Sequence, residues 1–174
     1  MLAGIRDILI ISTERDLNIF SDLLGNGERF GISLNYKVQK TPKGIADAFI
    51  IGESFIANSP VALILGDNLL HGNELVTYLQ NADRNQTGAT IFTYRVNDPQ
   101  RYGIVEFNQN KEVINIEEKP KIPKSSYAVI GLYFFDNTVV EKTKMLSFSS
   151  RGELEITSLN KIYIKENNLT AQII

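Results

Sequence analysis

Short runs of apolar residues alternate with segments of helical periodicity through the first half of the chain. The apolar runs at 8–12, 34–39, 62–65 and 89–96 have the length of buried strands. Between them, apolar side chains recur at helical spacing over 16–24, from Pro42 through 45–56, and over 74–82. Apolar strands that alternate with helices are typical of a parallel sheet covered by helices. The sequence therefore predicts an α/β fold.

The second half of the chain has a different pattern. Residues 103–107 and 112–117 are extended segments joined by a short polar connection, and 128–135 is a third extended run. Such short connections predict antiparallel pairing. Helical segments at 138–146 and 153–165 then precede a last strand-like run at 169–174. We predict a single partial domain, with one part at 1–97 and a second at 98–174.

Composition excludes several classes of protein. The 174 residues carry a net charge of −2 with no run of like charge, which argues against a nucleic-acid or membrane-surface partner. The absence of cysteine and the single histidine exclude disulfides, thiolate metal sites and His-rich metal sites. No apolar stretch approaches the roughly 18 residues of a membrane span, and no signal peptide is visible. A cytoplasmic location is expected.

A carboxylate at the end of a strand is the first candidate for function. In ALILGDNLLHG, residues 62–72, the apolar run ends at Gly66 and Asp67. Ligands of open parallel sheets bind beyond the carboxyl ends of the strands. Asp67 is therefore a candidate ligand or metal residue, with a structural cap of the following turn as the alternative.

Five stretches in fixed order carry a resemblance to a known family. They are QKTPKGIADAF at 39–49, LILGDN at 63–68, NDPQRYGIVEF at 97–107, IEEKP at 116–120 and SRGELEIT at 150–157. Together they resemble the sugar-nucleotide pyrophosphorylases, and among these most closely the glucose-1-phosphate thymidylyltransferase family. The resemblance implies a Rossmann-like nucleotidyltransferase sheet with helices on both faces, plus a more antiparallel sugar-binding part. It also implies transfer of a thymidylyl group from dTTP to glucose 1-phosphate, giving dTDP-glucose and pyrophosphate for dTDP-rhamnose synthesis.

The resemblance assigns roles on the nucleotide side of the site. Asp67 would be a catalytic residue that binds Mg²⁺ and the nucleotide, since a hard ion suits carboxylate and phosphate oxygens. Gln39 would pair with the thymine edge, and Gly44 would let the backbone approach the base. Without the resemblance, Gln39 reads as an exposed strand end. Asp47 departs from the family pattern and places a negative charge near the nucleotide.

The resemblance also assigns a sugar-phosphate site, with Lys119 as a second catalytic residue. Its members are Tyr102, Gly103, Glu118, Lys119, Tyr133 and Arg151. A carboxylate accepts hydrogen bonds from sugar hydroxyls, and cations neutralise the phosphate. Taken without the resemblance, EEKP is a solvated strand end, Tyr133 is a core residue, and Arg151 caps a surface turn.

Two family features do not occur within these 174 residues. One is the glycine-rich GGxGTRL loop after the family's first strand, and the other is a WxDTG-like segment that supplies the second metal ligand. The expectation is a central fragment that lacks the first strand and is truncated at both ends, of a family whose members are homo-oligomers. We expect the isolated chain to be poorly soluble or molten, and inactive. The alternatives are a remnant that at most binds sugar phosphate or nucleotide or pairs with full-length subunits, and a nucleotidyltransferase that uses UTP or CTP.

Overall fold

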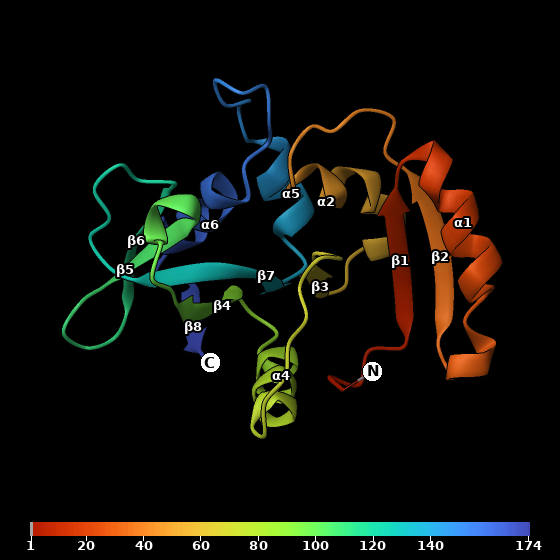
Figure 1. The fold of residues 1–174 in the computed structure, drawn as a ribbon, viewed down its shortest axis with the longest axis horizontal. Helices are drawn as coiled ribbons and strands as arrows, with labels where there is room; N and C mark the ends of the chain where they lie inside the picture. The colour runs from red at the N-terminus through yellow and green to blue at the C-terminus, as the bar shows by residue number, and fades with distance from the viewer. Residues whose placement is uncertain (1) are drawn as a thin grey trace.

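The computed structural model describes residues 2–174 and contains eight strands and six α-helices within them (Figure 1). The strands are β1 (Asp7–Ser12), β2 (Ser33–Val38), β3 (Val61–Ile64), β4 (Ala89–Arg95), β5 (Gly103–Phe107), β6 (Val113–Glu118), β7 (Tyr127–Phe135) and β8 (Leu169–Ile173). The helices are α1 (Glu14–Leu24), α2 (Asp47–Ile51), α3 (Glu53–Ile56), α4 (Leu75–Arg84), α5 (Val139–Lys144) and α6 (Ile156–Lys165). Two 3₁₀ turns, η1 (Glu28–Phe30) and η2 (Pro99–Arg101), complete the elements.

The strands form two separate sheets within residues 2–174. β1 and β2 pair in parallel as a two-stranded sheet. The six-stranded sheet has the order β6-β5-β7-β4-β8, and β3 pairs with β7. Figure 1 places β1, β2 and α1 at one side, with α2 and α5 above the larger sheet and α4 below it. The predicted α/β fold with helices on both faces is confirmed, and the predicted antiparallel pairing of β5 with β6 is confirmed as well. β5 also pairs antiparallel with β7.

The boundaries of α1 follow from its caps. The hydroxyl of Thr13 accepts a hydrogen bond of 3.2 Å from the backbone N–H of Asp16, so the helix starts two residues before the predicted position. Gly25 ends it with φ of +61°, a left-handed conformation that favours glycine.

The single helix predicted over 45–56 is divided in two. Gly52 separates α2 from α3, and its N–H donates to the carbonyl of Ala48 at 2.8 Å. The residues before Asp47 do not join α2, because backbone hydrogen bonds tie them to Leu154 instead. The N–H of Leu154 donates to the carbonyl of Lys43 at 2.6 Å, and the N–H of Ala46 donates to the carbonyl of Leu154 at 3.2 Å.

Two apolar clusters fill the space between the large sheet and its helices. The larger one contains the aromatic rings of Phe49, Tyr133, Phe135 and Tyr163, and the smaller one contains Phe92, Leu132, Phe134 and Ala82. In contrast, β1 and β3 contain no fully buried residue, although the sequence predicts both as buried strands. The prediction is wrong because each of these strands is paired along one edge only within the described part of the chain. None of the described helices is long and apolar enough to cross a membrane.

Candidate active site

The six-stranded sheet forks along one edge of β7. β4 pairs with both ends of β7, so β3 and β5 share the opposite edge, where β5 pairs with 127–128 and β3 with 132–135. Gly131 lies between these pairings. Its carbonyl accepts a hydrogen bond of 2.9 Å from the N–H of Leu65, and the N–H of Gly131 donates a hydrogen bond of 3.1 Å to Oδ1 of Asn68. The fork brings the end of β3 next to the start of β5, on the same edge of β7.

Asp67 lies at this fork, directly after β3. Its carboxylate is exposed, and Oδ1 accepts a hydrogen bond of 2.7 Å from Nδ2 of Asn68. Asn68 in turn is fixed against Gly131, where a Cβ atom would lie 2.5 Å from Nδ2 of Asn68. The absence of a side chain at residue 131 therefore positions Asn68, and Asn68 positions Asp67. Sequence reasoning missed Asn68, although it stands next to Asp67 in the LILGDN motif.

Glu118 occupies the other side of the fork, at the end of β6. It stands opposite Gly103 in the β5–β6 pair, and its Oε2 accepts a hydrogen bond of 2.7 Å from the hydroxyl of Thr157. A Cβ atom at Gly103 would lie 3.3 Å from this oxygen and 3.5 Å from Thr157 Oγ1. Glycine at 103 therefore leaves room for the Glu118–Thr157 contact. Thr157 was not predicted as a site residue, although it ends the SRGELEIT motif.

Two cations flank the other oxygen of Glu118. Oε1 lies 4.0 Å from Nζ of Lys119 and 3.9 Å from Nη2 of Arg151. Lys119 has φ of +44°, a left-handed conformation that is strained for a residue with a side chain. Its N–H donates to the carbonyl of Tyr102 at 3.0 Å, which joins the end of β6 to the residue before β5. The structure thus gathers five of the six predicted sugar-phosphate residues around one carboxylate: Tyr102, Gly103, Glu118, Lys119 and Arg151.

Arg151 lies closer to two other carboxylates than it does to Glu118. Its Nη2 lies 2.9 Å from both carboxylate oxygens of Glu155, and 3.3 Å from Oε2 of Glu153. The hydrogen bond to Glu155 and the charges of the three glutamates raise the pKa of the guanidinium. The ion pair between Arg151 and Glu155 also shapes the loop before α6. This helix begins at Ile156, whereas the sequence predicts that it begins at residue 153. Arg151 therefore holds a surface turn, as its sequence context alone predicts, and it also lies near Glu118. Its contact with a sugar phosphate stays a prediction.

Tyr133 is a core residue, as its sequence pattern alone predicts. Its side chain is 3% exposed, and its ring stacks on Phe135 with centroids 6.1 Å apart. Burial raises the pKa of its phenol, and the negative charge of Glu118 raises it further. The buried ring of Tyr133 therefore belongs to the core and feels the charge of Glu118.

Two of the three predicted nucleotide residues, Gln39 and Gly44, lie on a separate loop between β2 and α2. Nε2 of Gln39 donates to Oδ2 of Asp47 at 3.0 Å, and Asp47 is only 8% exposed. Gly44 has φ of +95°, and a Cβ atom there would lie 2.5 Å from the carbonyl oxygen of Leu154. The close backbone approach expected of Gly44 is thus made to Leu154, two residues before α6. As a result, the loop of Gln39 and Gly44 is anchored to the loop that carries Arg151.

A metal site would depend on groups besides Asp67. No cluster of three or more His, Asp or Glu side chains suited to a metal ion occurs within residues 2–174. Mg²⁺ is commonly bound by one or two carboxylates together with substrate phosphates, and the exposed carboxylate of Asp67 fits that arrangement.

Comparisons with known proteins agree with the resemblance. Residues 1–174 match the family described as nucleotidyl transferase. The chain is 52% identical to glucose-1-phosphate thymidylyltransferase of Neisseria meningitidis serogroup A / serotype 4A over 174 residues, and 53% identical to the enzyme of that name from Neisseria gonorrhoeae. Each match covers 100% of this chain and 60% of the relative, so the chain spans about three fifths of their length.

Solved structures share the fold. A Bacillus anthracis protein assigned as a glucose-1-phosphate thymidylyltransferase, solved with sucrose, superimposes with a TM-score of 0.86 at 40% identity, covering 96% of this chain and 67% of that chain. UDP-glucose pyrophosphorylase complexed with UDP-glucose superimposes with a TM-score of 0.81 at 23% identity, covering 100% of this chain and 74% of that chain. The second likeness concerns the fold alone. The match along the whole sequence shows that the chain belongs to the nucleotidyl transferase family.

Proposed function

We propose that this chain supplies the central part of a glucose-1-phosphate thymidylyltransferase. In the reaction, a phosphate oxygen of glucose 1-phosphate attacks the α-phosphorus of dTTP, the bond to the β-phosphate breaks, and pyrophosphate leaves. Phosphoryl transfer of this kind depends on positioning and charge neutralisation more than on covalent chemistry. The observation that carries the proposal is the Glu118 cluster, where one oriented carboxylate is flanked by two cations.

Each member of the cluster has a role that suits a sugar phosphate. Glu118 accepts hydrogen bonds from sugar hydroxyls, and Thr157 holds it in place. Lys119 neutralises the phosphate as a point charge. Its ammonium is half exposed and lies 4.0 Å from Glu118, so a phosphate can approach it beside the sugar hydroxyls that donate to Glu118. Arg151 joins it when its contact with Glu155 is exchanged for the phosphate. Tyr102 and Gly103 form the adjacent wall, and Tyr133 supports it from below.

On the nucleotide side, we assign Gln39 and Gly44 to the thymine base and Asp67 to the triphosphate. Asp67 would hold Mg²⁺ together with the nucleotide phosphates, where the ion stabilises the negative charge that develops during transfer. The amide of Gln39 already donates to Asp47, so pairing with a base uses its remaining donor and its carbonyl.

Calorimetric titration with glucose 1-phosphate and with glucose tests the sugar-phosphate site, in a chain completed with the two family features that these 174 residues lack. Because the cations contact the phosphate, we expect glucose 1-phosphate to bind at least about tenfold more tightly than glucose. Lys119→Gln should remove most of this difference, whereas Lys161→Gln, an exposed change on α6, should leave it intact. Equal affinities for the two ligands would contradict the proposal.

The nucleotide is tested with dTTP, UTP and CTP in the presence of Mg²⁺, together with pyrophosphate release when glucose 1-phosphate is added. Preference for dTTP supports the thymidylyl assignment, and preference for UTP or CTP replaces it with the corresponding transferase. In a chain completed with the two family features that these 174 residues lack, binding of either substrate without release of pyrophosphate supports the alternative of a binding protein that does not turn over.

The finer assignments belong to the same proposal. We assign residues 1–97 to nucleotide binding and 98–174 to sugar binding, in a protein that acts as a homo-oligomer. The substrates are phosphorylated metabolites, so we place the reaction in the cytoplasm, with dTDP-glucose passing to dTDP-rhamnose synthesis.

A further inference from the structure

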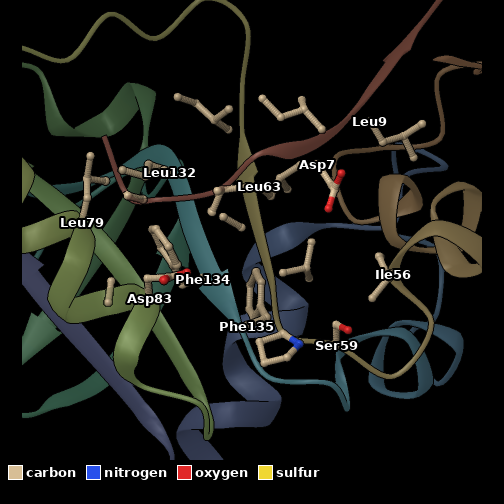
Figure 2. A pocket seen from close by; sticks show the side chains of 18 of the residues that line it. Asp7, Leu9, Ile56, Ser59, Leu63, Leu79, Asp83, Leu132, Phe134 and Phe135 are labelled. Atoms are coloured by element: carbon tan, nitrogen blue, oxygen red, sulfur yellow. The ribbon is translucent and has the colours of Figure 1, made fainter. Parts of the chain in front are cut away.

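Three buried polar side chains lie along one face of α6, which packs against β6 (Figure 1). Thr157, Asn160 and Tyr163 follow one another at intervals of three residues, so they are spaced about 4.5 Å apart along the helix axis. An apolar cavity of about 830 Å³ lies elsewhere, between β1 and β3, where Figure 2 shows Leu9 and Leu63 beside it. No residue of α6 lines that cavity, so the polar row is separate from it.

The two outer members of the polar row have hydrogen-bond partners, and the middle one has none. The hydroxyl of Thr157 donates to Oε2 of Glu118 at 2.7 Å. The phenol of Tyr163 donates to Oδ1 of Asp136 at 3.0 Å. Asn160 is only 1% exposed, yet neither its Nδ2 nor its Oδ1 makes a hydrogen bond within residues 2–174. It is therefore an exception, because the large majority of buried polar side-chain atoms have a partner.

The stability of α6 does not account for an asparagine at this position. Asparagine is a weak helix former, because its side chain competes with the helix for backbone groups. In addition, an amide that is removed from water without gaining a partner destabilises the folded state. A leucine of similar volume would avoid both costs. A role in the neighbouring site gives a reason for the amide of Asn160.

Helix geometry directs this amide toward Thr157 rather than toward Tyr163. Side chains of an α-helix lean toward its N-terminus, over the residues three and four positions earlier. For Asn160 these are Thr157 and Ile156, and only Thr157 has a polar side chain. The hydroxyl of Thr157 uses its single proton for Glu118, which leaves the lone pairs of its oxygen open to a donor.

We propose that Asn160 is a positioning residue for Glu118, whose Nδ2 donates to Oγ1 of Thr157 either directly or through one buried water. This inference rests on the proposed function, because Glu118 is the residue that accepts from the sugar. A hydroxyl that accepts from an amide keeps its proton for its other partner. Asn160 therefore holds the O–H of Thr157 toward Glu118, and the hydrogen bonds of such a chain strengthen one another.

Calorimetry with glucose 1-phosphate tests this role, in a chain completed with the two family features that these 174 residues lack. Asn160→Leu keeps a similar volume but removes the donor, so affinity should fall about three- to tenfold, as for the loss of one neutral hydrogen bond. Because Asn160 acts through Thr157, the double variant Asn160→Leu/Thr157→Val should bind within about twofold of Thr157→Val alone. Unchanged affinity in Asn160→Leu, or losses that multiply in the double variant, would overturn the proposal.

Tyr163→Phe is the matched control, because it removes a buried polar group one turn further along the same face. We expect its free energy of unfolding to fall, since the hydrogen bond to Asp136 is lost, while its affinity for glucose 1-phosphate stays unchanged. If Tyr163→Phe weakens binding as much as Asn160→Leu does, the packing of α6 sets the affinity and the proposal is wrong. Loss of stability without loss of affinity in Asn160→Leu would assign the amide to folding, with the same consequence.

A crystal structure of the completed natural chain with glucose 1-phosphate gives a readout that needs no substitution. We expect Nδ2 of Asn160 within hydrogen-bond distance of Oγ1 of Thr157, or of one water that also contacts this oxygen. An amide paired only with other groups would overturn the proposal. Failure of the proposed function is distinguishable, because the natural chain would then bind glucose 1-phosphate no better than glucose. If only this inference fails, the natural chain and Asn160→Leu both prefer glucose 1-phosphate to the same extent.

Discussion

The hydroxyl of Thr157 donates a hydrogen bond of 2.7 Å to Oε2 of Glu118, and this contact joins the first turn of α6 to the end of β6. The other oxygen of Glu118 is left facing Lys119 at 4.0 Å. One residue of a helix therefore fixes the orientation of a carboxylate whose other oxygen faces two cations.

Replacing Thr157 should weaken binding through Glu118. Thr157→Val keeps the shape of the side chain but removes the donor, and we expect affinity for glucose 1-phosphate to fall about tenfold, because a hydrogen bond to a charged group is worth about 1.5–3 kcal/mol. Thr157→Ser should restore most of the affinity. Titration calorimetry measures both, and equal losses in the two variants would show that packing rather than the hydroxyl is responsible.

Lys119→Gly should separate stability from binding. Glycine tolerates the φ of +44° at this position, so relief of strain offsets its extra entropy in the unfolded chain, and the free energy of unfolding should stay within about 1 kcal/mol of the natural value. Binding of glucose 1-phosphate should nevertheless decrease at least about tenfold. Urea unfolding and calorimetry test the two halves, and retained affinity would remove Lys119 from the site.

Asp67→Asn should abolish the effect of Mg²⁺ on nucleotide binding. In the natural chain, we expect dTTP to bind more tightly with Mg²⁺ than without it, because Asp67 and the phosphates would share the ion. The amide of the variant loses the negative charge while its size is preserved. Asp22→Asn on the exposed side of α1 is the control. A persistent Mg²⁺ effect in Asp67→Asn would contradict the metal assignment.

Asp136 should make the stability of the chain sensitive to acid. Burial favours its neutral form, but hydrogen bonds from Thr138, from the N–H of Gly88 at 2.7 Å and from the phenol of Tyr163 at 3.0 Å outweigh burial and lower its pKa. Because its pKa is lower in the folded state, Asp136 adds stability at pH values above its unfolded pKa of about 3.9. This stability is lost as the pH falls through the lower pKa of the folded state.

Asp136→Asn tests that linkage. We expect the free energy of unfolding at pH 7 to fall by about 1–3 kcal/mol, since charge-assisted hydrogen bonds are lost. Urea unfolding from pH 3 to 7 should show that the free energy of unfolding decreases less toward low pH in the variant than in the natural chain. Parallel pH profiles would mean that Asp136 does not titrate differently on folding.

Local stability should differ sharply between the two sheets. β1, β2 and α1 contain no fully buried residue, whereas five of the seven residues of β4 are buried. Elements with few buried contacts open more readily, so amides of 7–12 and 33–38 should exchange at least about a hundredfold faster than those of 89–95. Hydrogen exchange of the chain alone measures this, and uniform protection would contradict the expectation.

The sequence was sufficient to predict most of the secondary structure and five members of the Glu118 cluster. Strand and helix patterns are local, and motif residues such as Glu118 and Lys119 are adjacent in the chain. The late start of α2 at Asp47 was missed, because it depends on hydrogen bonds of Lys43 and Ala46 with Leu154, more than a hundred residues away in the chain. Thr157 was missed for the same reason, since its partner Glu118 lies on another element.

Burial was the least predictable property. The run at 8–12 is apolar at nearly every position, as a central strand should be, yet β1 is only half-buried because one of its edges has no partner within the described chain. Conversely, the burial of Tyr133 could be inferred from its apolar neighbours on β7. A pattern shows which side chains favour burial, but the elements that cover them come from elsewhere in the protein.

The contact between Gly44 and Leu154 has a consequence for how two ligands would bind. Because the loop of Gln39 is attached to the loop of Arg151 through the backbone of Leu154, a ligand that restricts the motion of one loop should also restrict the other. A nucleotide that orders the first loop would lower the entropic cost of ordering the second for a sugar phosphate, and the reverse holds equally. The two substrates would then bind with positive cooperativity, through the backbone and without touching one another.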